Sequence, residues 1–224
     1  RDCLLSRGLG DVYKRQGLVL LFMYAPILIL AVYSFTDSGN IGSIHGFSMQ
    51  NYVTLFTKGE LRDMIVGTVL LALVSSLLAT IFGTMGAIGA FYSKKLAKNF
   101  INTANQIPVV NADVVTGFSI CVLLIVAFGM NKESYVPLLI GHVVLSAPFV
   151  YLSVVPKLKQ MDASLYEAAM DLGASPSMAL RKVVIPQIMP GIVSGFALAI
   201  TLSLDDYFIA SYTKPATFNT ISTY

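Results

Sequence analysis

Charged residues are scarce in this sequence. Only 12% of its 224 residues are Asp, Glu, Lys or Arg, whereas 55% are hydrophobic. A composition this poor in charge excludes an ordinary water-soluble domain. The net charge of +3 does not indicate a nucleic-acid partner, because the basic residues lie in short segments beside apolar runs. The composition therefore indicates a polytopic membrane protein.

Cysteine is also rare, and the two that occur are far apart. Cys3 lies near the start and Cys121 lies inside an apolar run, so neither a disulfide framework nor a paired metal-ligand motif is indicated. The sequence contains no H-E-x-x-H or G-x-S-x-G motif and no G-x-x-x-x-G-K-S/T phosphate loop. We therefore expect a chain that is not an enzyme and that has no metal, cofactor or ATP site of its own.

Five continuous apolar runs approach or exceed the ~20 residues that a helix needs to cross ~30 Å of hydrocarbon. They are Leu18–Phe35, Met64–Tyr92, Val114–Met130 with a polar lead-in from Phe100, Tyr135–Pro156 and Val183–Leu204. Because the runs are continuously apolar and do not alternate, they indicate helices and not the strands of a barrel. We predict an all-α membrane helix bundle with five transmembrane helices.

The distribution of lysine and arginine predicts the orientation. Residues 93–102 and 157–182 hold seven basic residues in 36, whereas residues 37–63, 131–134 and 205–224 hold four in 51. Cytoplasmic loops carry the excess of positive charge. We therefore expect the first two segments and the N-terminus to be cytoplasmic.

Small residues are concentrated in the second span, in the stretch "GTMGAIGA". Gly83, Gly86, Gly89 and Ala90 recur there at helical spacing, which allows helix backbones to approach closely. We expect this span to be buried in the bundle, although glycine is also generally abundant in membrane helices.

Residues 1–16, "RDCLLSRGLGDVYKRQ", lack both an initiator Met and a spanning pattern. They resemble the translated adapter or assembly scars found at the ends of metagenome-derived reading frames, and we leave them out of the predicted fold. The alternative is a genuine basic cytoplasmic leader. We expect one transmembrane domain over residues 17–224.

A polar, glycine-punctuated segment separates the last two apolar runs. Asp162 is placed to cap a short helix, and Gly173 stands where a left-handed C-terminal cap would end it. Ser175 is placed to cap a second helix with Pro176 at its first position, and Pro186 precedes the fifth span. We expect a helix, a sharp turn and a second helix on the cytoplasmic surface.

This segment resembles the EAA loop of ABC importer permeases, here spanning about residues 157–186. The order is Glu167-Ala168-Ala169, three residues, Gly173, nine residues, Val183, one residue and Ile185-Pro186. Valine and isoleucine stand where that family commonly has isoleucine and leucine. The resemblance implies that Glu167, Ala168, Ala169, Gly173 and Pro186 form a coupling loop that docks in a cleft of an ATPase subunit.

The resemblance extends from about residue 17 to the end of the sequence. The stretches "EAAMDLGAS" and "TLSLDDYFIASYTKP" are most similar to the spermidine/putrescine permeases, specifically their C-type subunits. The resemblance implies a type I ABC importer permease fold in a bacterial inner membrane. The implied partners are an ATPase dimer that binds the ATP, a second permease subunit and a periplasmic or lipid-anchored substrate-binding protein. These permeases usually have six spans, so we expect a sixth span to be missing by truncation.

Acidic residues at the ends of spans are candidates for a solute path that favours cations. They are Asp113, Asp205 and Asp206, beside which Tyr207 offers a ring for cation–π contact with a polyamine. The alternative is that these aspartates only cap helices. We expect His142 to be a packing or hydrogen-bonding residue, and His45 a solvated loop residue.

Three functions remain open at this point. The first is an ABC permease for polyamines, and the second is the same machine for another solute such as ferric iron, thiamine or an oxyanion. The third is a secondary transporter or channel that works without an ATPase. The EAA spacing favours the first two, because we find no internal repeat of the kind that secondary transporters commonly show.

Overall fold

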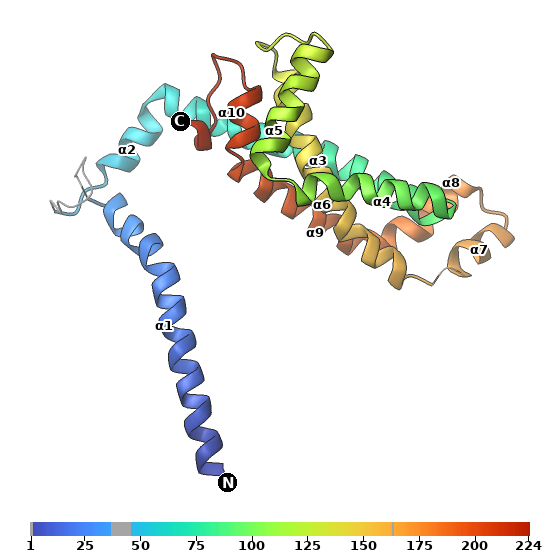
Figure 1. Cartoon of the computed structure of the whole chain (residues 1–224), viewed down its shortest axis with the longest axis horizontal. Helices are drawn as coiled ribbons and strands as arrows, with labels where there is room; N and C mark the ends of the chain where they lie inside the picture. Colours follow the sequence, from blue (N-terminus) through green and yellow to red (C-terminus); the bar gives the residue numbers. More distant parts are fainter. Residues whose placement is uncertain (1, 37–45, 163) are drawn as a thin grey trace. The chain divides into compact units, whose positions relative to one another are not determined.

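A computed structural model of the chain describes residues 2–36, 46–162 and 164–224, with side chains from Val12 onward (Figure 1). His45 and its expected place in a solvated loop lie outside the described residues. The chain divides into two compact units, and the boundary in the sequence lies between Arg62 and Asp63. The described residues are helical apart from turns and one isolated bridge between Thr36 and Phe47.

The first unit contains a long helix and a short one. Helix α1 (Asp2–Ser34) continues through residues 2–16, which the sequence analysis left out of the fold, and includes Pro26. Helix α2 (Gln50–Thr57) packs against its end. The hydroxyls of Ser34 and Tyr52 lie 2.9 Å apart. The rings of Phe35 and Tyr52 have centroids 5.3 Å apart.

The second unit is a bundle built on three long helices. Its elements are α3 (Gly59–Tyr92, entered from the first unit), α4 (Lys95–Val110), α5 (Asp113–Cys121), π-helical turn η1 (Val122–Ala127), α6 (Tyr135–Gln160), α7 (Ser164–Asp171), α8 (Pro176–Ala179), π-helical turn η2 (Leu180–Val184), α9 (Ile185–Asp205), α10 (Phe208–Thr213) and 3-10 turn η3 (Ile221–Thr223). Helices α6 and α9 run alongside each other, with α7 and α8 at one end of the pair and α10 at the other (Figure 1).

Glycine allows the long helices to approach closely. A Cβ at Gly83 of α3 would lie 2.7 Å from the Ala147 carbonyl oxygen of α6, and one at Gly195 of α9 would lie 3.1 Å from the Val150 Cα. The predicted close packing of the second span is therefore confirmed at Gly83. It is wrong at Gly89, where the space is open; the buried face continues through Ala87 and Ala90, which follow the 3.6-residue helical period.

Among the residues that the structure describes, four helices are long and apolar enough to cross a membrane: Val12–Ser34, Gly59–Tyr92, Tyr135–Gln160 and Pro176–Asp205. The predicted third span differs, because its lead-in is a separate helix. Helix α4 is bent by 110° from the helix of Asp113–Ala127. Asn111 and Ala112 have extended backbones between the two, and Pro108, which lacks an N–H group, lies in the last turn of α4. The expected five spans are present when this bent pair counts as one.

Candidate functional site

Helix α6 ends at Gln160, within the segment that resembles a coupling loop, and Asp162 leads into α7. The Ser164 N–H donates to Asp162 Oδ1 at 3.0 Å, and the Leu165 N–H donates to the Asp162 carbonyl. Hydrogen bonds from the Ser164 backbone and side chain stabilise the carboxylate and lower the pKa of Asp162. The predicted cap at Asp162 is confirmed.

Helix α7 ends in a left-handed turn at Gly173, which has φ +85°. The Gly173 N–H donates to the Met170 carbonyl at 2.9 Å, and the Ala174 N–H donates to the Ala169 carbonyl at 3.0 Å. These are the two hydrogen bonds of a Schellman motif. The predicted left-handed cap is confirmed, and it requires glycine because a side chain at positive φ is strained.

The chain re-enters a helix directly after this turn. Ser175 Oγ accepts the Met178 N–H at 3.4 Å, with Pro176 at the first helical position, as predicted. From Pro176 to Asp205 the helix then runs without interruption. The residue pattern predicted a separate short helix before Pro186. The π-helical turn of η2 instead precedes Pro186, so the backbone passes the proline without breaking.

The loop presents a mixed acidic and apolar surface. Glu167, Ala168 and Asp171 are exposed, whereas Ala169 is half-buried. Leu172 is 90% exposed and lies at the rim of a hollow of about 300 Å³. The walls of the hollow come from both sides of the turn and are formed by Ala169, Leu172, Gly173, Ala174, Met178, Ala179, Lys182 and Val183. This shape can receive a protruding apolar group from a partner.

An aromatic contact fixes α7 to the bundle. The rings of Tyr166 and Tyr92, the last residue of α3, have centroids 5.1 Å apart. Tyr166 also packs against the core cluster that contains Val154, Leu158 and Ile188. Helix α7 is therefore in direct contact with α3, α6 and α9.

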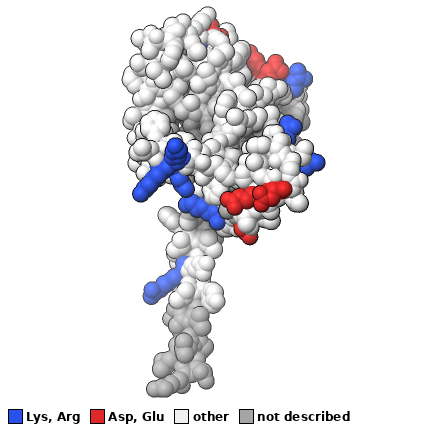
Figure 2. All heavy atoms as spheres, turned by 90° about the vertical axis from the view of Figure 1, so that its right-hand side faces the viewer, with Lys and Arg blue, Asp and Glu red and all other residues white. Residues whose placement is uncertain are grey.

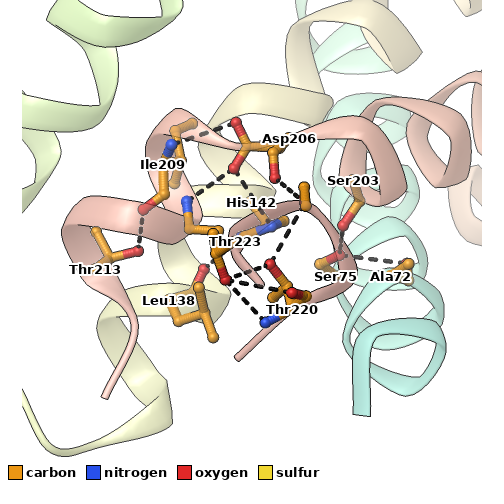
Figure 3. A network of polar contacts seen from close by, with 12 residues as sticks. Ala72, Ser75, Leu138, His142, Ser203, Asp206, Ile209, Thr213, Thr220 and Thr223 are labelled. Carbon is orange, nitrogen blue, oxygen red and sulfur yellow. Dashed lines mark hydrogen bonds and ion pairs between the residues drawn. The ribbon is translucent and has the colours of Figure 1, made fainter. Parts of the chain in front are cut away.

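A buried polar network occupies the opposite end of the bundle (Figure 3). The carboxylate of Asp206 accepts the Ala210 N–H at 2.8 Å and the Ile209 N–H at 3.3 Å, so it caps α10. His142 Nδ1 lies 2.9 Å from the Leu138 carbonyl oxygen and must donate to it. His142 Nε2 consequently faces Asp206 Oδ2, at 3.7 Å, and both side chains are buried.

Hydroxyl groups extend this network toward α3 and η3 (Figure 3). The Ser75 and Ser203 hydroxyls lie 2.9 Å apart and join α3 to α9. The Ile221 N–H donates to Thr68 Oγ1 at 3.1 Å, and Ser222 Oγ donates to the Asp206 carbonyl at 2.7 Å. The segment after α10 is therefore tied to both long helices.

The four residues predicted for a solute path do not form one cluster. Asp205 ends α9 and is exposed, as is Asp113, the first residue of α5. Tyr207 is 50% exposed, and its ring packs edge-on against Phe208. Asp206 alone is buried, although Asp113 is close enough to act on it electrostatically.

Sequence reasoning missed the pairing of His142 with Asp206. The two residues are 64 positions apart, and no local pattern joins residues at that separation. The expectation that His142 forms hydrogen bonds is confirmed. Within the described ranges, no group of three or more His, Cys, Asp or Glu side chains is placed to hold a metal ion.

Comparison with known proteins supplies the context for this geometry. Residues 79–223 match the model of the family described as "Binding-protein-dependent transport system inner membrane component". A spermidine/putrescine transport system permease protein, PotC, of Haemophilus influenzae is 33% identical over 194 residues, which cover 87% of this chain and 75% of that protein. A putrescine transport system permease protein, PotI, of Escherichia coli K12 is 33% identical over 196 residues, covering 85% of this chain and 70% of that protein.

Solved structures also match, among them the crystal structure of an amino acid ABC transporter with histidines. It is 22% identical and has a TM-score of 0.49, with 69% of this chain and 72% of that chain covered.

Proposed function

This chain belongs to the family of binding-protein-dependent transport system inner membrane components, and from that premise we propose that it is the permease subunit of an ATP-driven polyamine importer. The polyamine assignment rests on sequence identity: this chain is 31–33% identical, over 85–87% of its length, to permeases named for spermidine and putrescine. The chain is a multi-pass membrane protein of a family whose members are not themselves enzymes.

The coupling loop at residues 157–186 is the proposed contact with an ATPase dimer, which would bind the ATP. Three observations support it: Glu167 is exposed, Gly173 makes a tight turn, and a hollow with largely apolar walls lies at that turn. An ATPase shifts the permease between two states only by its differential affinity for them. A second permease subunit and a substrate-binding protein complete the proposed assembly, with the N-terminus of this chain in the cytoplasm.

The solute path is proposed to include Asp205, Asp113 and Tyr207, whose side chains are exposed. Asp206, also predicted for the path, would act on it chiefly by holding α10, because its carboxylate is buried and accepts two backbone N–H groups. Exposed carboxylates favour the ammonium groups of a polyamine over anions.

The test is uptake in cells that lack their own polyamine importers and that produce this chain with its partner subunits. We expect energy-dependent uptake of labelled putrescine or spermidine and none of thiamine or ferric iron. Asp205→Asn should slow polyamine uptake several-fold, because one negative charge is lost at the path, while the exposed control Glu60→Gln leaves it unchanged. Uptake of thiamine or iron without polyamines would overturn the solute assignment.

A further inference from the structure

A small cavity lies near the coupling loop, between α3, α4 and α6. Its volume is about 40 Å³, and its polar lining consists of Lys98 and Asn102 of α4 with Tyr151 and Lys159 of α6. Its remaining walls are apolar and include Phe91 of α3. The coupling loop, which starts after α6, is adjacent because Tyr166 packs on the same core cluster as Phe91 and Ile101.

The polar groups of the cavity present hydrogen-bond donors. Tyr151, which is 3% exposed, donates its hydroxyl hydrogen to Asn102 Oδ1. This contact fixes the amide of Asn102, so its Nδ2 group is directed elsewhere as a donor. No hydrogen bond of Asn102 Nδ2 occurs in the described part of the chain. Asn102 is half-buried, and its Nδ2 group is a donor to which a ligand can offer an acceptor.

The charge of the cavity has one sign. Lys98 Nζ lies 5.9 Å from the centroid of the Phe91 ring, and Lys159 approaches from another helix. No carboxylate lines the cavity, and neither lysine has an ion-pair partner among the described residues. Figure 2 shows this end of the molecule, where Lys and Arg side chains lie at separate places with Asp and Glu side chains among them. Two ammonium groups and an amide donor select an anion and repel a polyamine, so the cavity is not part of the solute path.

The surroundings of the cavity indicate which anion it takes. Helix α4 is amphipathic and is bent by 110° from the spanning helix that follows it, a geometry that places a helix along a membrane interface. Its apolar side chains Leu96 and Phe100 are 86% and 75% exposed. A space of about 40 Å³ exceeds the room that one water needs and accommodates oxygen atoms of a phosphate. Acyl chains attached to that phosphate would lie along the exposed apolar face of α4.

We propose that this cavity binds the phosphate headgroup of an anionic phospholipid. Lys98 and Lys159 neutralise the phosphate, and Asn102 Nδ2 donates to one of its oxygens while Tyr151 holds the amide in place. Basic pockets between membrane helices bind anionic headgroups in this way. The site is independent of the transported solute. A lipid bound there would contact α3, α4 and α6, and the coupling loop follows α6.

The test is lipid binding to the purified importer complex in detergent, measured by native mass spectrometry. The probes are dioleoyl phosphatidylglycerol, dioleoyl phosphatidylcholine and inorganic phosphate. We expect one phosphatidylglycerol per copy of this chain, bound in preference to phosphatidylcholine. The double substitution Lys98→Gln with Lys159→Gln should weaken binding about 30-fold, as expected from losing two lysine contacts to a headgroup.

A matched control separates a built site from general surface charge. Lys94→Gln with Lys95→Gln removes the same charge next to α4 but outside the cavity lining, and it should change the affinity less than 3-fold. Asn102→Ala should weaken binding about 5-fold without any change in charge. The proposal is overturned if both lysine pairs weaken binding equally, or if phosphatidylcholine binds as well as phosphatidylglycerol. It is also overturned if inorganic phosphate displaces the lipid at equal concentration, since the site would then serve free phosphate.

Discussion

At the scale of single residues, Asp205 and Asp206 are neighbours in sequence but lie in opposite environments. Asp205 is exposed at the end of α9, whereas the buried carboxylate of Asp206 caps α10 and faces His142. Removing the second carboxylate leaves the backbone N–H groups of Ile209 and Ala210 without their acceptor. Removing the first leaves no buried group unsatisfied.

We therefore expect Asp206→Ala to destabilise the folded protein and Asp205→Ala to leave its stability unchanged. Loss of a helix cap costs about 1–2 kcal/mol, which corresponds to a fall in Tm of roughly 3 °C or more. Thermal unfolding of the purified protein in detergent measures the difference. Equal Tm values for the two variants would show that the cap contributes nothing.

Gly173 gives a second prediction at this scale, because its role depends on backbone conformation and not on space. Its φ is +85°, and nothing lies within 4 Å of a Cβ placed there. Gly173→Val should strain the turn, since a β-branched residue at positive φ is a conformational outlier. Gly173→Asn should be tolerated, because asparagine adopts this region. We expect Val to abolish uptake by the complex while the chain still inserts, and Asn to preserve uptake; loss of uptake in both would indicate a requirement other than the turn.

At the scale of elements, the contact between α3 and α6 depends on which glycine faces the partner helix. Gly83→Ala would place a methyl group 2.7 Å from the Ala147 carbonyl and 2.8 Å from Val150 Cβ. Overpacking of this kind costs about 1–3 kcal/mol. Gly89→Ala meets open space and should be neutral or gain up to about 1 kcal/mol of helix propensity. Thermal unfolding of the two variants compares them, and a similar loss in both would contradict the packing described.

Local sequence patterns predicted some features of the helices and not others. Apolar length predicted four of the spans, and the caps at Ser175 and Gly173 followed from the preferred residues of helix ends. The 110° break between α4 and α5 was missed, because the polar lead-in from Phe100 was joined to the apolar run at Val114, whereas the backbone is extended at Asn111 and Ala112. The pairing of His142 with Asp206 was missed for a different reason: it forms only when α6 and the start of α10 meet in space. Local periodicity carries no information on such contacts.

At the scale of the whole molecule, the distribution of basic residues predicts which ends of the helices face the cytoplasm. In a chain with Cys3→Ser and Cys121→Ser, a cysteine at Lys95 should resist an impermeant thiol reagent, whereas one at Lys132 should react. Serine suits position 121, because the thiol there donates to the Tyr212 carbonyl at 3.3 Å and a hydroxyl can do the same. Labelling of intact cells measures the two accessibilities. The reverse pattern would invert the topology.

The helix from Pro176 to Asp205 is uninterrupted, so a tilt at one of its ends also displaces the other end. Its 30 residues have a length of about 45 Å, so a tilt of about 5° pivoting at the loop end displaces the far tip by roughly 4 Å. The helix includes the π-helical turn of η2 and Pro190 but is continuous, and Asp206 is the next residue after its end. If a partner docks at the Gly173 turn, as proposed, a tilt of this helix would also displace Asp206 and the start of α10, which follow its last residue.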